Sequence, residues 1–164
     1  MSEAPQRGAF ARQRPFASAS PGVGHRRIAT ELLRERLLDG GSIVTSSLGV
    51  SMEPALRSGV ELRVERCALD SLRRGDIVCL DRGDQLVAHR LIALVSSGGR
   101  RWFLTRGDNN LLPDRPLPEP AYLGRVTGFR SPAGGDWSPP PSHLEPVVPL
   151  GRLVAAIRSK LAIF

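Results

Sequence analysis

The chain has 164 residues, the usual size of one domain and too short for two enzyme domains. Apolar residues make up 41% and charged residues 24% of it, which excludes wholesale disorder and predicts one globular domain with tails. We expect neither a transmembrane segment nor a cleaved signal peptide, because no apolar run approaches about 18 residues.

The net charge of +7 would suit a nucleic acid or an anionic membrane as partner. Most cations are nevertheless scattered along the chain and stand beside acidic residues, which is typical of a solvated surface. The two cysteines, Cys67 and Cys79, form no CxxC pair. They indicate buried thiols rather than a zinc framework or a redox motif.

The first 40 residues divide into a tail and a helix. Residues 1–24 are rich in Ala, Ser, Pro, Gly and Arg without apolar periodicity, so we predict a disordered tail. Residues 25–40 are predicted to form an amphipathic helix that stops at a Gly-Gly pair. Its apolar residues at helical spacing are Ile28, Leu32, Leu33, Leu37 and Leu38.

Residues 41–130 carry the signals of short strands separated by turns that contain Gly and Asp. The predicted strands are 42–45, 60–65, 77–80, 86–95, 101–105 and 122–129. The Arg-Gly-Asp turn at 82–84 joins two of them into a hairpin. This pattern predicts a mainly β fold, built as an antiparallel barrel or sandwich.

The last 34 residues again divide into two parts. Residues 131–146 hold five of the fourteen prolines and are predicted to be a Pro-rich linker. Residues 147–164 are predicted to form a C-terminal amphipathic helix, with an apolar stripe and basic residues beside it. This helix would either dock on the β domain or anchor the protein peripherally on anionic lipid.

A candidate nucleophile lies just after the first predicted strand. Ser51 follows Gly49 and precedes Pro54, in a turn that can expose its hydroxyl. A nucleophilic serine needs a rigidly held Oγ, backbone amides that stabilise an oxyanion, and a base within hydrogen-bond reach. Taken alone, such a serine is more often a simple turn residue.

Candidate bases are few, because the chain has three histidines and a single lysine, Lys160. His25 opens the predicted helix and His143 lies in the Pro-rich linker. His89 lies within the apolar hairpin strand and is the one well-placed titratable base. A lone histidine in a strand is otherwise more often structural.

Two carboxylates follow the strand 101–105, namely Asp108 and Asp114. A Gly-Asp-Asn sequence favours a polar turn in any case. Alternatively, one of the two carboxylates orients His89 and stabilises its imidazolium, as a catalytic triad requires.

Together these segments resemble the type I signal peptidases, in particular their endoplasmic-reticulum type, within the superfamily that also holds the self-cleaving LexA-like repressors. The resemblance covers about residues 43–129. The matching segments, in the order of the family's motifs, are Gly49-Val50-Ser51-Met52-Glu53-Pro54, Arg74-Gly75-Asp76-Ile77-Val78, Val87-Ala88-His89-Arg90-Leu91, and Gly107-Asp108-Asn109-Asn110 with Asp114-Arg115. The resemblance implies the family's antiparallel β-barrel, with residues 41–130 as a serine peptidase domain.

The resemblance also implies roles for the candidate residues. Ser51 would be the nucleophile, and His89 would be the base at a position that is lysine in most bacterial signal peptidases. Asp114 would be the third member of the triad, with Asp108 as the second choice. The implied reaction is cleavage of a precursor protein or leader peptide after small residues through an acyl-enzyme. We expect no cofactor and no metal.

Signal peptidases carry an N-terminal spanning helix, whereas this chain has a polar tail and a charged helix there, so we expect a peripheral membrane or cytoplasmic location. Two other functions stay open. The chain could be a basic module that binds nucleic acid or another partner on an inherited peptidase fold. It could also be a LexA-like self-cleaving regulator, although neither a helix-turn-helix nor an Ala-Gly ahead of Ser51 is present.

Overall fold

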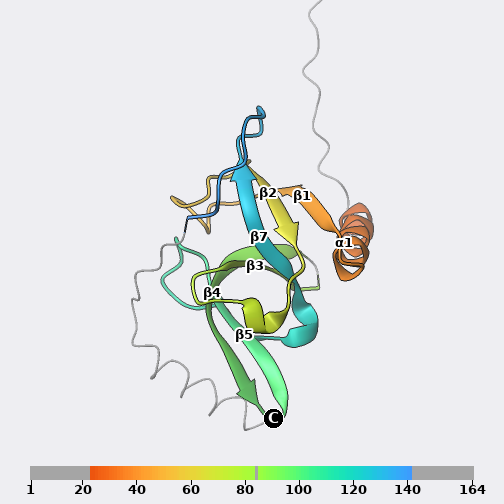
Figure 1. Cartoon of the computed structure of the whole chain (residues 1–164), viewed down its shortest axis with the longest axis vertical. Coiled ribbons are helices and arrows are strands. Elements are labelled where there is room, and N and C mark those ends of the chain that lie inside the picture. Colours follow the sequence, from red (N-terminus) through yellow and green to blue (C-terminus); the bar gives the residue numbers. More distant parts are fainter. Residues whose placement is uncertain (1–22, 84, 142–164) are drawn as a thin grey trace, which may run out of the picture.

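The computed structural model describes residues 23–83 and 85–141, and it is mainly β, as expected. One helix stands beside a single antiparallel sheet that curls strongly (Figure 1). The elements are α1 (Val23–Leu38), β1 (Ser42–Ser46), β2 (Glu61–Glu65), β3 (Ile77–Asp81), β4 (Leu86–Ser97), β5 (Arg100–Arg106), β6 (Leu117–Pro118) and β7 (Tyr122–Arg130). Short 3-10 turns, η1 (Leu69–Ser71) and η2 (Glu119–Ala121), precede β3 and β7.

The seven strands follow the order β1-β2-β7-β3-β4-β5-β6, so the last strand lies between β2 and β3. The predicted strands are all present. Sequence reasoning missed β6, which is two residues long and ends in Pro118. Because proline cannot donate a ladder hydrogen bond, it is tolerated at an edge such as this one.

The hairpin expected around residues 82–84 joins β3 and β4, with Val78 opposite His89. At its turn the N–H of Arg82 donates to the carbonyl of Gln85 at 3.0 Å. Only the first part of β4 pairs with β3, and pairing with β5 begins at Arg90. Within the described part of the chain, Leu86–His89 therefore has a strand on one side and a free backbone edge on the other.

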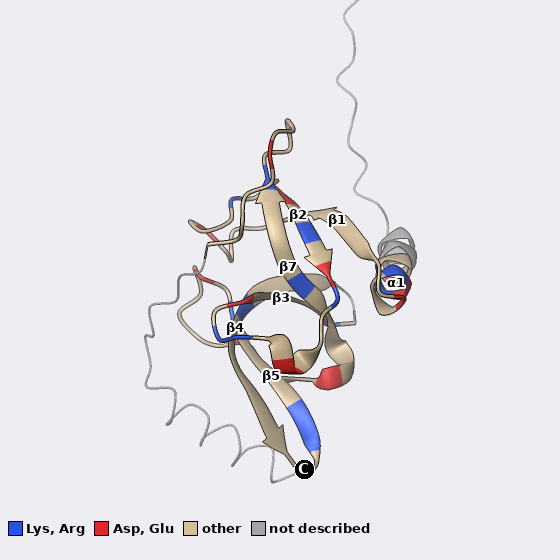
Figure 2. Cartoon of the chain, in the orientation of Figure 1, with Lys and Arg blue, Asp and Glu red and all other residues tan. Residues whose placement is uncertain are grey.

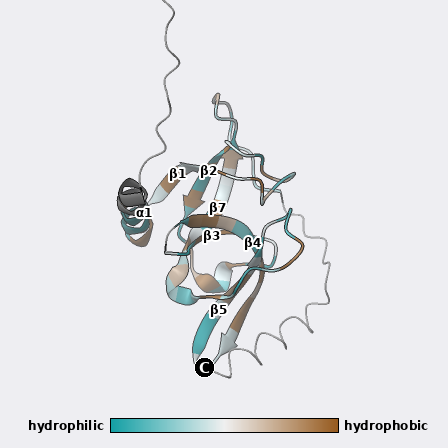
Figure 3. Cartoon of the chain, turned by 180° about the vertical axis from the view of Figure 1, so that it is seen from behind, coloured by the Kyte–Doolittle hydropathy of each residue, from teal (hydrophilic) through white to brown (hydrophobic). Residues whose placement is uncertain are grey.

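The core consists of two groups of buried side chains. One joins α1 to β1, β2, β3 and β7, and the other lies among β3, β4, β5 and β7. In the second group the rings of Phe103 and Tyr122 stack with centroids 5.1 Å apart. The ribbon of β3 is largely brown in Figure 3 because Ile77–Leu80 are apolar, and all four of these residues are buried. A strand buried on both faces needs no polar alternation.

The predicted helix at 25–40 begins and ends about two residues earlier, as α1. Its apolar face is narrower than the sequence pattern implied. Leu37 is fully buried and Leu33 packs beside it, whereas Leu32 is 61% and Leu38 47% exposed. The helix lies closest to β1 and β7, and among its described side chains the covered apolar ones are Leu33 and Leu37.

The described part of the Pro-rich segment, residues 131–141, returns to the sheet. Phe129 and Ser138 exchange two backbone hydrogen bonds of 2.9 Å. The guanidinium groups of Arg63 and Arg130 lie over the Trp137 ring, 4.3 and 4.6 Å from its centroid. The predicted tail up to residue 22 and the predicted helix at 147–164 lie outside the described residues.

Arginines are spread over α1, β2, β5 and β7 rather than gathered on one element (Figure 2). Several form ion pairs with acidic side chains, including Arg34–Asp81 and Arg130–Glu61. This distribution is that of a solvated basic surface. No helix in the described ranges is both long enough and apolar enough to cross a bilayer.

Candidate active site

Ser51 lies in a loop between β1 and β2 that is closed at its base. Ser47 bonds to Val60 and Gly59 through backbone hydrogen bonds of 2.8 and 2.7 Å. Two residues before the serine, Gly49 has a φ of +100°, a backbone conformation that residues with a side chain rarely adopt. Just after it, Met52 is 3% exposed and anchors the loop in the core. The anchored loop therefore holds the Ser51 backbone in a defined place.

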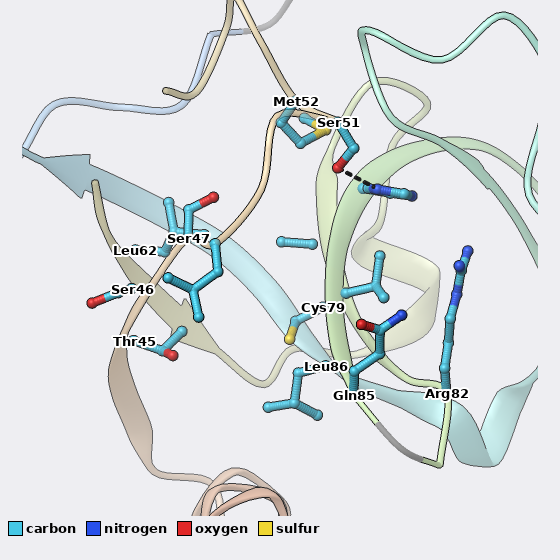
Figure 4. Close-up of a pocket in the computed structure, with 14 residues that line it drawn as sticks. Thr45, Ser46, Ser47, Ser51, Met52, Leu62, Cys79, Arg82, Gln85 and Leu86 are labelled. Atoms are coloured by element: carbon cyan, nitrogen blue, oxygen red, sulfur yellow. Dashed lines mark hydrogen bonds between the residues drawn. The ribbon is translucent and has the colours of Figure 1, made fainter. Parts of the chain in front are cut away.

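The structure brings Ser51, His89 and Asp114 together in a hydrogen-bonded row. His89, 5% exposed on β4, has its Nε2 atom 2.9 Å from the Ser51 Oγ, the bond drawn as a dashed line from Ser51 in Figure 4. Its Nδ1 atom lies 2.6 Å from the Asp114 Oδ2. This is the order of contacts that a Ser/His/Asp triad requires.

Asp114 is held by β5 and by a cation. Its N–H donates to the carbonyl of Thr105 at 2.8 Å, and the Thr105 hydroxyl donates to its Oδ2 at 2.8 Å. Arg82 lies 2.9 Å from its other oxygen, Oδ1. Burial disfavours the charged carboxylate, but the bonds from His89, Thr105 and Arg82 outweigh it and hold the pKa of Asp114 below its usual value.

Asp108 has a different partner. It forms a two-pronged ion pair with Arg90, whose Nε donates to Asp108 Oδ1 at 2.8 Å and whose Nη2 faces Oδ2. Arg90 is fully buried and also donates to the carbonyls of Gly75 and Pro141. Since Ser51 and Asp114 occupy both ring nitrogens of His89, Asp114 and not Asp108 is the carboxylate at the imidazole.

The loop that carries Asp108 forms hydrogen bonds with the backbone around Ser51. The N–H of Asn109 donates to the Ser51 carbonyl at 2.8 Å, and its side-chain amide donates to the Val50 carbonyl at 3.2 Å. Gly107 approaches so closely that a Cβ there would lie 2.5 Å from the Ser51 carbonyl oxygen. Sequence reasoning placed Asn109 in a motif without assigning this contact.

We expect Gly107→Ala to slow acylation of Ser51 by about 100-fold, because the added methyl group must push the serine backbone aside and small misplacements of this kind are costly. The rate constant for labelling by a serine-reactive acylating probe measures this. Gly128→Ala on β7 is a less crowded comparison, since a Cβ there would lie 3.3 Å from the nearest atom, in the Trp137 ring. Equal rates in wild type and Gly107→Ala would show that this loop does not position the Ser51 backbone.

A cleft of about 300 Å³ opens beside Ser51, between the end of β1 and the start of β4 (Figure 4). Thr45, Ser47 and Leu48 line one side, and Gln85 to His89 line the other. Cys79 lies at this cleft, where burial and the charge of Asp81 raise the pKa of its thiol to about 12. The thiol therefore stays protonated and is a poor rival nucleophile.

Of the other candidate bases, His25 alone falls within the described residues. His25 lies in the first turns of α1. His143 and Lys160 lie outside the described residues. Sequence reasoning did not assign a role to Arg82 or Thr105, because a turn arginine and a strand threonine carry no local signal of a contact with Asp114.

The chain therefore has a β-rich fold in which a serine, a histidine and an aspartate are joined by hydrogen bonds beside a cleft. No protein-family model matches the chain. It is similar to signal peptidase I W of Bacillus subtilis (strain 168), with 30% identity over 95 residues, which covers 56% of this chain and 50% of that protein. The chain thus spans about half the length of this curated relative. The similarity supports a signal peptidase I-like relationship.

Proposed function

We propose that the chain is a signal-peptidase-like serine endopeptidase of the Ser/His/Asp type, built on the antiparallel β-barrel of the signal peptidase and LexA-like group. The observation that carries the proposal is the row of contacts from Ser51 Oγ through His89 to Asp114, at 2.9 and 2.6 Å, at the edge of a cleft. The similarity to a signal peptidase I supports the class of reaction.

In the first step, the Ser51 Oγ attacks the carbonyl carbon of the scissile peptide bond while His89 Nε2 takes the hydroxyl proton. The carbonyl π electrons move onto the oxygen, and the Ser51 N–H is the donor that we assign to this oxyanion. Asp114 stabilises the imidazolium through Nδ1. The C–N bond then breaks, and His89 gives the proton to the leaving amine.

In the second step, His89 takes a proton from water, which attacks the ester on Ser51. Collapse of the second tetrahedral intermediate breaks the bond to Oγ, and His89 returns its proton to Ser51. The upstream fragment leaves as a carboxylic acid, which then loses its proton to solvent. Each group ends as it began. No step requires a cofactor.

Histidine is the base that the chain offers at this place. A lysine base would have to be Lys160, the single lysine of the sequence, which lies far from the four motifs along the chain. His89 is instead in direct contact with Ser51. These two observations favour the endoplasmic-reticulum type of signal peptidase over the Ser/Lys type.

The proposed substrate is a precursor protein or leader peptide that lies in the cleft as an extended strand. The free edge of Leu86–His89 offers backbone groups to such a strand, and the end of β1 lines the opposite side. Family resemblance adds a preference for small side chains before the cut. Peripheral contact with a membrane remains a prediction attached to residues 147–164.

The test is to label the full chain with a serine-reactive acylating probe between about pH 5 and 9, the range in which histidine changes its charge. We expect one adduct, mapped to Ser51 by mass spectrometry, whose rate rises with pH as the imidazole loses its proton. Ser51→Ala should remove the adduct. His89→Ala should slow labelling by about 10² to 10⁴-fold, the usual contribution of a general base.

Ser96→Ala is the matched control, because Ser96 is exposed on β4, the strand that carries His89, and does not line the cleft. It should label as fast as wild type. Labelling that persists in both Ser51→Ala and His89→Ala would overturn the peptidase proposal and favour a basic binding module on an inherited fold.

A further inference from the structure

We propose that Arg82 is a positioning residue of this site, which holds one oxygen of Asp114 so that the other stays on His89 and whose positive charge opposes protonation of His89. The inference rests on the proposed function, in which His89 must be neutral to act as the base. Arg82 belongs to none of the four sequence motifs. It comes from the β3–β4 turn, a part of the chain that the triad does not otherwise use.

The two carboxylate oxygens of Asp114 contact different partners. Oδ2 faces the His89 ring at 2.6 Å and accepts from the Thr105 hydroxyl at 2.8 Å. Oδ1 lies 2.9 Å from the Arg82 Nη2. The carboxylate side chain is 8% exposed, so water reaches it poorly. Turning the carboxylate away from His89 would require breaking its contact with Arg82.

The turn that carries Arg82 is itself held in place. Its backbone N–H bonds to Gln85 at 3.0 Å, and the preceding Asp81 bonds to Arg34 at 3.0 Å and to the N–H of Gly83 at 2.6 Å. From this turn the Arg82 side chain extends along the cleft toward the end that holds Ser51 (Figure 4). A guanidinium anchored in this way restrains the carboxylate more than a mobile surface cation would.

The other charges near the triad do not replace Arg82. Arg90 on β4 is paired with Asp108. Arg106 on β5 lies opposite Arg90 in the strand register, and Arg115, which follows Asp114, is exposed. Ser51 and Thr105, which face His89 and Asp114 from the other elements, are neutral. Among the described residues, the ion pairs of Asp114 are therefore those with His89 and Arg82.

The sign of the effect follows from these contacts. The charge of Asp114 favours the imidazolium form of His89, and the Arg82 cation partly compensates that charge. Without the cation, His89 takes up its proton at higher pH, and the carboxylate is free to turn. Both changes reduce the fraction of molecules in which His89 is neutral and correctly oriented.

The experiment is a nitrogen NMR titration of the histidine rings in the full chain, for wild type, Arg82→Gln and Arg82→Lys. In Arg82→Gln we expect the midpoint of the His89 titration to rise by about one pH unit, since a charge close to a titratable group has an effect of this order. Arg82→Lys retains the charge and should keep the midpoint near that of wild type. His25 and His143 provide internal references.

Arg130→Gln is the matched control, because it removes an ion pair outside the β3–β4 turn from an arginine of similar exposure, 32% against 29%. Its His89 midpoint should equal that of wild type. An unchanged midpoint in Arg82→Gln, or an equal shift in Arg130→Gln, would overturn the role of Arg82.

Probe labelling of the same samples separates this inference from the proposed function. If Arg82→Gln shifts the His89 midpoint but Ser51 is not labelled in wild type, the peptidase proposal fails while the coupling of Arg82 to His89 stands. If Ser51 is labelled and the midpoint does not move, the peptidase stands and Arg82 is not a positioning residue.

Discussion

Asp114→Asn is expected to slow acylation of Ser51 by about 10⁴-fold, the loss that follows when the aspartate of such a triad becomes an amide. The asparagine retains the shape but not the charge. Its amide can donate to His89 Nδ1, which would move the ring proton to Nε2, the atom that must accept the proton of Ser51. The rate constant of labelling by the acylating probe, followed by intact mass, measures the effect.

Asp108→Asn is the matched comparison, because it makes the same chemical change in a carboxylate that contacts Arg90 instead of His89. We expect its labelling rate, per folded molecule, to stay within about tenfold of wild type, since the triad contacts are retained. A loss in Asp108→Asn as large as that in Asp114→Asn would show that the two carboxylates have been assigned in the wrong order.

Asp108→Ala is expected to lower the free energy of unfolding by about 3 to 5 kcal/mol, because it leaves the Arg90 guanidinium buried without its carboxylate. Arg90 is 0% exposed and also ties the carbonyls of Gly75 and Pro141 to β4. Its charge is therefore costly to leave unpaired. Urea denaturation followed by circular dichroism gives the change.

Two controls separate a buried ion pair from an ordinary surface one. Glu119→Ala breaks an ion pair of the solvent-exposed Arg101 and should lower the free energy of unfolding far less than Asp108→Ala does. The double variant Arg90→Met with Asp108→Ala should be more stable than Asp108→Ala alone, because the unpaired charge is gone. A double variant no more stable than Asp108→Ala would contradict this account.

The sequence alone could not decide whether Asp108 or Asp114 contacts His89. Asp108 and Asp114 lie six positions apart in one polar segment after β5, and either could reach a histidine on the neighbouring strand. The two carboxylates have partners on other elements. Arg90 on β4 forms an ion pair with Asp108, whereas Thr105 on β5 and Arg82 in the β3–β4 turn contact Asp114. Contacts between elements decide such a choice, and spacing along one segment does not.

The sequence by itself determined the local elements and the candidate residues. Alternating apolar residues and Gly/Asp turns predicted the strands because these signals act over a few neighbouring positions. His89 could be selected as the candidate base because the chain has only three histidines and one lysine. The tertiary structure alone decided the position of β7 between β2 and β3, the narrow buried face of α1, and the contact of Arg82 with Asp114. Each of these depends on packing between residues distant in the chain, where one local pattern is compatible with several arrangements.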